Sequence, residues 1–192
     1  MKRYLITDPD YYGSSASELE LALDAVYSHH LPDFALFRDK SSSDYRSMAE
    51  VFLDISREYK IAKVFLHRDY TLASELGADG VHLNRYEDIK IAKSLGLEVV
   101  FSSHSIDDGL RAVDEGADYL TYSPIFSTPN KGEPVGLENL KDFTAKISAP
   151  IFALGGIIDD TQLQELEATG VYGFASIRYF VYSKILQNYK SD

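Results

Sequence analysis

Residues 77–122 read GADGVHLNRYEDIKIAKSLGLEVVFSSHSIDDGLRAVDEGADYLTY, and this stretch decides the fold. A short apolar run at 80–83 is followed by a segment with helical spacing, and the same order repeats through the runs at 98–102 and 119–122. Gly116 follows the second helical segment, at a position where glycine commonly ends a helix. Short strands that alternate with helices predict parallel strands joined by helical crossovers.

The same alternation extends in both directions along the chain. Strand-like apolar runs fall at 3–7, 34–38, 63–67, 80–83, 98–102, 119–122, 151–154 and 173–176. Helical spacing occupies 17–29, 44–59, 70–76, 85–95, 106–115, 137–147, 161–168 and 177–188. Eight strand–helix units predict an α/β fold of the (βα)8 TIM-barrel type, because eight parallel strands close a barrel. The alternative, an open doubly wound sheet, would have five or six units and strands buried on both faces.

The length of the chain limits the size of this barrel. It has 192 residues, 45% of them hydrophobic, and no low-complexity tract or linker rich in Gly, Pro or Ser divides it. We therefore expect a single TIM-barrel domain over residues 1–192. Since such barrels typically have about 250 residues, the loops must be minimal.

Charge and cysteine content exclude several functional classes. The net charge of −11 disfavours nucleic acid and anionic membranes as partners, because both require a basic face. The absence of cysteine excludes disulfides, thiolate metal sites and cysteine nucleophiles. No apolar run is long enough to span a bilayer, and Asp8 comes too early for a signal peptide. We expect a cytoplasmic protein; whether it forms a homo-oligomer is left open.

The active site of a TIM barrel lies at the C-terminal ends of its strands. Polar and basic residues follow the predicted strands in the order Thr7-Asp8, Arg38-Asp39-Lys40, His67-Arg68-Asp69, His82-Leu83-Asn84, Ser102-Ser103-His104, 123–131, Gly155-Gly156 and Ala175-Ser176. The longest loop, 123–136, follows the sixth strand and is a candidate lid or ligand clamp.

The last two strand ends predict a phosphate site. Gly155 and Gly156 follow the seventh strand, where residues without side chains let backbone N–H groups approach an anion. Ser176 and Ile177 open the last predicted helix, whose N-terminus offers unpaired N–H groups and a partial positive charge. Phosphate sites in barrels commonly use these two loops, so we expect a phosphorylated ligand here.

Five short motifs, taken together, resemble those of thiamine phosphate synthase and its TenI-type relatives. They are GADGVHL at 77–83, SSHS at 102–105, GADY at 116–119, PIFSTPNK at 124–131 and ALGGI at 153–157. The resemblance runs in order from Arg3 to about Ile177. It implies a TIM barrel that handles small phosphorylated heterocycles of thiamine biosynthesis.

The synthase joins a hydroxymethylpyrimidine pyrophosphate to a thiazole phosphate, and pyrophosphate departs before the thiazole nitrogen attacks. The resemblance implies that four residues contact the pyrophosphate and act in catalysis: Arg38, Lys40, Ser102 and Lys131. It places the thiazole phosphate near Thr128, Gly155, Gly156, Ser176 and Ile177, with His67, Arg68 and His104 as further substrate contacts. One departure is Leu36, which stands where the family has a glutamine.

The metal site implied by the resemblance is incomplete. Arg68 occupies the position of an aspartate that holds Mg²⁺ in the synthases, so Mg²⁺ as a cofactor is in doubt. Asp69, Glu87 and Asp88 are the remaining candidate ligands. Arg68 either offsets the pyrophosphate charge without a metal, or indicates that pyrophosphate is not bound.

Two other functions compete with the synthase. The TenI-type relative is a tautomerase of thiazole phosphate carboxylate, whose catalytic histidine falls on Pro124 here. His67, His104 or Asp69 could replace it as the acid–base group. The third hypothesis is a non-catalytic barrel that binds thiazole or thiamine phosphate. We favour the transferase over the tautomerase, and the sequence does not decide between them.

Overall fold

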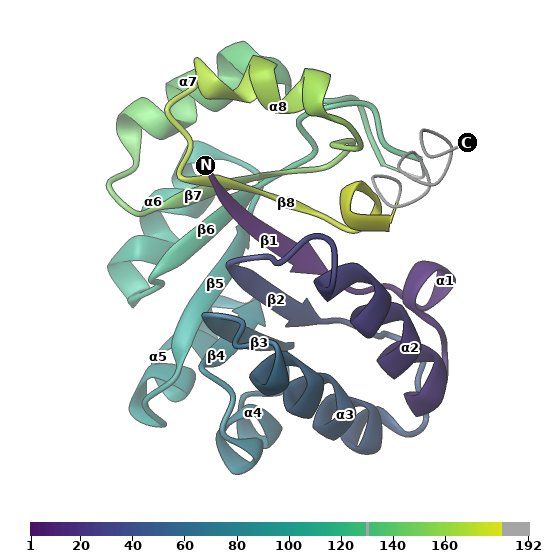
Figure 1. Ribbon diagram of the computed structural model, residues 1–192. Coiled ribbons are helices and arrows are strands. Elements are labelled where there is room, and N and C mark those ends of the chain that lie inside the picture. Colours follow the sequence, from purple (N-terminus) through teal and green to yellow (C-terminus); the bar gives the residue numbers. More distant parts are fainter. Residues whose placement is uncertain (130, 182–192) are drawn as a thin grey trace, which may run out of the picture.

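The computed structural model describes residues 1–129 and 131–181, which form a closed barrel of eight parallel strands in sequence order. The strands are β1 (Lys2–Ile6), β2 (Phe34–Phe37), β3 (Lys63–His67), β4 (Gly80–Leu83), β5 (Glu98–Ser103), β6 (Tyr119–Tyr122), β7 (Ile151–Leu154) and β8 (Gly173–Ser176). Each strand pairs with the next, and β8 pairs with β1, with Leu5 opposite Ser176. Figure 1 shows the strands following one another around the barrel. The predicted TIM barrel is confirmed.

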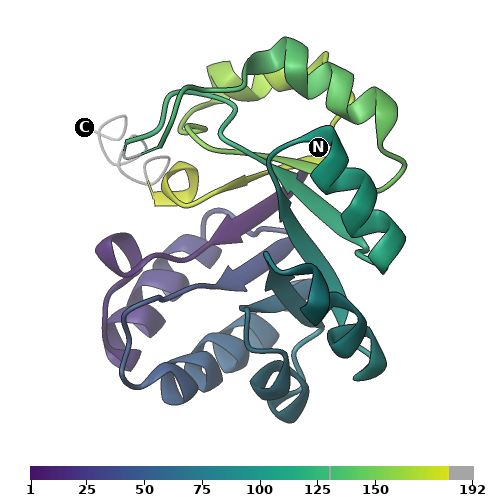
Figure 2. The same cartoon turned by 180° about the vertical axis from the view of Figure 1, so that it is seen from behind.

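Helices link the strands and lie around the outside of the barrel, as Figures 1 and 2 show from opposite sides. They are α1 (Pro9–Tyr12), α2 (Ala16–Tyr27), α3 (Tyr45–Glu58), α4 (Tyr70–Leu76), α5 (Tyr86–Ser94), α6 (Ile106–Glu115), α7 (Gly136–Lys146) and α8 (Asp160–Glu167). The helices α2 to α8 match the predicted segments to within one or two residues at their ends. None of the helices in the described part of the chain is both long and apolar enough to cross a membrane.

Two helices differ from the expectation. The short helix α1 was not predicted, although Asp8 caps it by accepting a hydrogen bond from the Asp10 amide and Pro9 starts it. The helix expected at 177–188 is described only over its first turn, 178–181, and the rest lies outside the described residues.

The repeated Gly-Ala-Asp sequence ends helices and starts strands. Gly77 and Gly116 have φ values of 69° and 108° and end α4 and α6 in the left-handed conformation, as the sequence predicted. The Asp79 carboxylate accepts a hydrogen bond of 2.8 Å from the amide of Val64, at the start of β3. The aspartates of this repeat therefore lie at the strand starts, away from the C-terminal ends.

The barrel interior is filled by side chains. Tyr4, Phe34, Phe65 and Phe152 pack there, with the rings of Phe34 and Phe65 stacked at 5.8 Å. These aromatic side chains fill the barrel interior, and the cavity described below lies at the C-terminal ends of the strands.

Candidate active site

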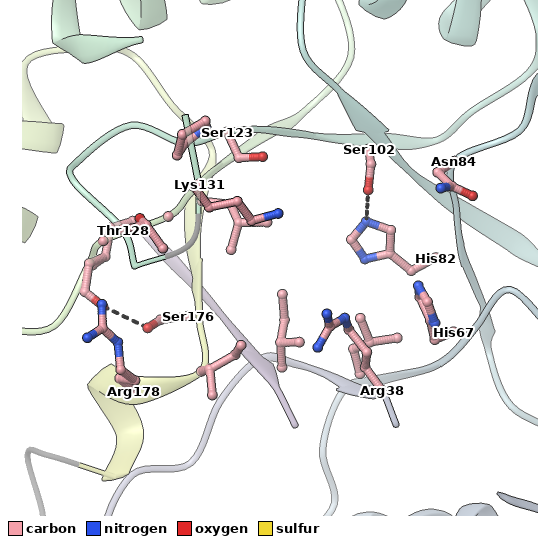
Figure 3. A pocket seen from close by; sticks show the side chains of 18 of the residues that line it. Arg38, His67, His82, Asn84, Ser102, Ser123, Thr128, Lys131, Ser176 and Arg178 are labelled. Carbon is pink, nitrogen blue, oxygen red and sulfur yellow. Dashed lines mark hydrogen bonds between the residues drawn. The ribbon is translucent and has the colours of Figure 1, made fainter. Parts of the chain in front are cut away.

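A cavity of about 280 Å³ opens at the C-terminal ends of the strands (Figure 3). Of the residues predicted for the site, those lining it are Arg38, Lys40, His67, Ser102, His104, Thr128, Lys131, Gly155, Gly156, Ser176 and Ile177. Apolar side chains also line it: Ile6, Leu36, Pro124, Leu154 and Ile157. The cavity therefore combines polar groups from most of the strand ends with a partly apolar wall.

The polar groups lie on two sides of this cavity. Figure 3 shows Arg38, His67, His82 and Ser102 on one side, and Thr128, Ser176 and Arg178 on the other. The Lys131 side chain reaches into the space between them from the loop after β6. Two separate polar regions in one cavity are suited to a ligand, or a pair of ligands, with two charged ends.

Arg38 is held at the end of β2 by two neighbours. Its guanidinium forms an ion pair with Asp8, with Nη1 2.8 Å from Oδ2. Its backbone amide donates to the Thr7 hydroxyl at 2.8 Å. Thr7 is almost fully buried, so the backbone at Arg38 is fixed and the guanidinium is directed to the rim of the cavity.

The cations beside Arg38 have no acidic partner in the described part of the chain. No ion pair forms at Lys40, Arg68 or Lys131 among the residues that the structure describes. The pKa of Lys40 is lowered, first by the charge of Arg38, then by burial and by Lys131 and Arg68. These four cations repel one another, and a bound anion would relieve that repulsion.

Arg68 does not line this cavity. It lies in an adjoining groove of about 730 Å³, which shares Lys40 and His67 with the cavity. Its backbone is left-handed, with φ of 68°, and its amide donates to the carbonyl of His82. Arg68 is thus close enough to lower the pKa of Lys40 and His67, but it faces a different hollow.

The three candidate acid–base groups lie in different surroundings. Burial, together with the charges of Arg38, Arg68 and Lys40, lowers the pKa of His67 to about 3. His104 lies with Nδ1 3.1 Å from the Ser123 carbonyl oxygen, which occupies that nitrogen. The third candidate, Asp69, uses its carboxylate to cap α4.

The glycine turn after β7 brings two loops together. Gly155 and Gly156 have φ values of 100° and 74°, and a Cβ at Gly156 would lie 2.7 Å from the Ser127 carbonyl oxygen. The amide of Phe126 donates to the Gly155 carbonyl at 3.0 Å. Glycine is therefore required here by the close approach of the 123–128 loop as well as by backbone conformation.

Ser176 has a structural role in addition to its place on the cavity wall. Its hydroxyl donates to the Ile157 carbonyl at 2.7 Å and accepts a hydrogen bond from the Tyr179 amide at 3.1 Å. The side chain therefore caps the first turn of the last helix and holds it beside the loop after β7. The backbone at 176–178 remains beside the cavity.

The sequence reasoning missed Arg178, which lines the cavity beside Ser176. No acidic partner pairs with it among the residues described. A cation in the first turn of a helix opposes the helix dipole, and this unfavourable placement was a signal for an anion site. Asn84, at the end of β4, also lines the cavity and was not assigned a role.

The candidate metal ligands contact neighbouring groups of the chain. The Asp69 carboxylate accepts from the Leu72 amide at 2.9 Å. Glu87 lies 2.8 Å from Arg85 Nε, and Asp88 lies 3.8 Å from the same atom. Across residues 1–129 and 131–181, no three His, Asp or Glu side chains gather to hold a metal ion. The candidate carboxylates are engaged by neighbours, and the position expected to carry an aspartate carries Arg68.

Comparison with known proteins shows the family of this chain. A family model described as "Thiamine monophosphate synthase" matches residues 3–180. The chain is 31% identical to "Putative thiamine-phosphate synthase 2" of Aquifex aeolicus, over 93% of this chain and 96% of that protein. It is 32% identical to the thiamine-phosphate synthase of Clostridium novyi, over 97% and 91% of the two chains.

A solved structure is similar to this chain in both fold and sequence. The thiamine phosphate pyrophosphorylase from Pyrococcus furiosus superposes with a TM-score of 0.78 at 27% identity, covering 97% of this chain and 94% of that one. Since the family model spans nearly the whole chain and two relatives exceed 30% identity over most of their length, the chain belongs to the thiamine monophosphate synthase family.

Proposed function

We propose that this chain joins a hydroxymethylpyrimidine pyrophosphate to a thiazole phosphate, forming thiamine phosphate and releasing pyrophosphate. The observation that carries the proposal is the cluster of Arg38, Lys40 and Lys131 at one cavity that also contains the Gly155–Gly156 turn. The side of the cavity with these cations suits a leaving pyrophosphate, and the side with the glycine turn suits the phosphate of a second substrate.

The reaction requires charge separation in a site with little water. As the bond to pyrophosphate breaks, negative charge grows on the leaving oxygen and positive charge on the pyrimidine methylene. Arg38, Lys40 and Lys131 would stabilise the growing negative charge through fixed positive groups. Apolar residues such as Leu36 and Leu154 would limit water, which would otherwise capture the pyrimidine cation.

The thiazole phosphate would bind at the opposite side. Backbone N–H groups after the Gly155–Gly156 turn and at 177–178 can approach its oxygens closely. Arg178 would add a guanidinium to the same oxygens, whereas the Thr128 hydroxyl donates to the Phe126 carbonyl at 2.9 Å. This placement directs the thiazole ring towards the middle of the cavity, where its nitrogen can attack the pyrimidine cation.

The tautomerase receives less support from the site. It needs a group that exchanges protons near neutral pH, but the pKa of His67 is about 3 and Asp69 caps a helix. His104 is the remaining acid–base candidate, because the Ser123 carbonyl contacts only its Nδ1. The cation cluster, in contrast, has a direct use in the release of pyrophosphate.

The deciding experiment measures product formation from the two substrates. We expect thiamine phosphate and pyrophosphate in equal amounts from the wild-type protein. Interconversion of thiazole phosphate carboxylate tautomers without coupling would replace the proposal by the tautomerase. Binding of thiazole phosphate with neither reaction would leave a non-catalytic binding barrel.

A further inference from the structure

A buried chain of hydrogen bonds runs from the barrel interior to the cavity. The Tyr4 hydroxyl lies 3.2 Å from His82 Nδ1, and His82 Nε2 lies 2.9 Å from Ser102 Oγ, as Figure 3 shows for the second pair. Tyr4 is fully buried and His82 is 4% exposed. Ser102 is partly exposed and lines the cavity, so these hydrogen bonds end at the cavity wall.

The surroundings of Tyr4 leave its hydroxyl a single polar partner. The ring packs against Phe34, Phe65 and Phe152. Within the part of the chain that the structure describes, only His82 accepts or donates a hydrogen bond at this hydroxyl. A buried hydroxyl that cannot donate its proton carries a large desolvation cost, so the direction of this bond matters.

His82 can connect its two neighbours in two ways. Burial lowers its pKa to about 3, so the ring is neutral near neutral pH and carries one N–H. In the first arrangement Tyr4 donates to Nδ1, and Nε2–H donates to Ser102. In the second, Nδ1–H donates to Tyr4, and Ser102 donates to Nε2.

Only the first arrangement satisfies all the buried groups. In the second, the Tyr4 proton points into the aromatic rings of the barrel interior without an acceptor. An unsatisfied buried donor of this kind disfavours an arrangement by about ten- to a hundredfold. The first arrangement therefore dominates, and it leaves the proton of Ser102 free.

We propose that Tyr4 and His82 hold the Ser102 hydroxyl as a hydrogen-bond donor to the cavity. Because Ser102 already accepts from His82, its proton is available only to a ligand oxygen or another acceptor. The ligand group at this point is an acceptor, such as an anionic oxygen. If the proposed function holds, that acceptor is the departing pyrophosphate or the pyrimidine ring. Tyr4 and His82 then act as positioning residues, through Ser102.

The first test observes the histidine ring directly and needs no activity. Nitrogen-15 NMR of the labelled protein distinguishes Nδ1–H from Nε2–H, and the His82→Gln variant assigns the signals. We expect Nε2–H in the wild type and a mixture of both forms in Tyr4→Phe, which removes the hydroxyl and retains the ring. Nδ1–H in the wild type would overturn the proposal.

The second test is a kinetic cycle with Ser102. We expect His82→Leu to lower kcat by about three- to tenfold, the value of an ordinary hydrogen bond, with little change in KM for thiazole phosphate. In a Ser102→Ala background the same change should have no further effect. Full retention of the loss in that background would show that His82 acts independently of Ser102 and refute the proposal.

A control variant and a replacement variant allow both tests to be interpreted independently of the proposed function. Tyr27→Phe removes another buried hydroxyl bonded to a serine, Ser56, far from the cavity, and should leave kcat unchanged. If His82→Leu fails to fold, Tyr4→Phe takes its place in the cycle. If the wild type shows no coupling of the two substrates, the proposed function fails, while the NMR result still decides the direction of the chain.

Discussion

Replacing Lys131 by methionine removes the positive charge and retains most of the side-chain volume. Lys131 reaches into the cavity from the 123–136 loop, and no carboxylate pairs with it among the described residues. Its charge can therefore act on a ligand. Since that ligand gains negative charge as the leaving bond breaks, the contact is stronger in the transition state than in the ground state.

The expected magnitude follows from the exposure of the ammonium group. A charge-assisted contact in a dry site contributes about 2–4 kcal/mol to transition-state stabilisation. Lys131 is exposed to solvent in the free chain, which favours the lower end of that range. A loss of about 2 kcal/mol corresponds to about a 30-fold decrease in kcat.

The assay is the steady-state formation of thiamine phosphate, with KM for both substrates measured beside kcat. We expect kcat to fall and the affinity for thiazole phosphate to remain close to that of the wild type. Lys141→Met, a matched change on α7 whose ammonium pairs with Glu138, should have no effect. An unchanged kcat, or a loss confined to the KM for thiazole phosphate, would refute the assignment of Lys131 to the leaving group.

Three further results are expected. Arg178→Ala should weaken thiazole phosphate binding in calorimetry by about tenfold, because a charge-assisted hydrogen bond is lost; unchanged affinity would remove Arg178 from the site. Turnover should persist in EDTA, because the carboxylates of Asp69 and Glu87 are already engaged; complete loss that Mg²⁺ restores would show a metal site. The free energy of unfolding should fall as pH drops from 6.5 towards 3, because His67 and His82 bind protons more weakly in the folded state. Urea unfolding across this pH range tests that decline, and a His82→Gln variant should show less of it.

Most of the fold could be predicted from the sequence, because its units repeat. Each strand–helix pair carries its own local signals, such as the left-handed glycine at Gly116 and the serine cap at Ser105. The final helix beyond 181 remains a prediction, since it lies outside the described residues. The short helix at Pro9–Tyr12 was missed although its cap, Asp8, is visible in the sequence.

The site could be predicted only in part, because contacts between distant strands leave no local pattern. Strand ends identified most of the cavity lining, yet nothing in the sequence links Tyr4 to His82, which are 78 residues apart. The sequence left open whether Arg68 contacts pyrophosphate; in the structure its backbone is left-handed, and it lines the groove beside the cavity. Strand register and backbone conformation decide which side chains reach the cavity, and both depend on the whole barrel.

The distribution of cations connects stability with function. In a chain of net charge −11, most described basic residues outside the site pair with an acid, as Lys93 does with Asp118. Lys40, Lys131 and Arg178 instead face the cavity without an acidic partner among the described residues. Such a cluster destabilises the free protein through mutual repulsion, and a bound anion offsets the repulsion.

Loss of the Lys131 charge should therefore change stability and anion binding in opposite directions. Lys131→Met should raise the free energy of unfolding by about 0.5 kcal/mol, as removal of an exposed like charge does. Pyrophosphate should raise the melting temperature of the wild type more than that of the variant, because the variant has lost part of the attraction. If the variant is less stable than the wild type, or if pyrophosphate stabilises both proteins equally, the cations at the barrel mouth are not arranged for an anion.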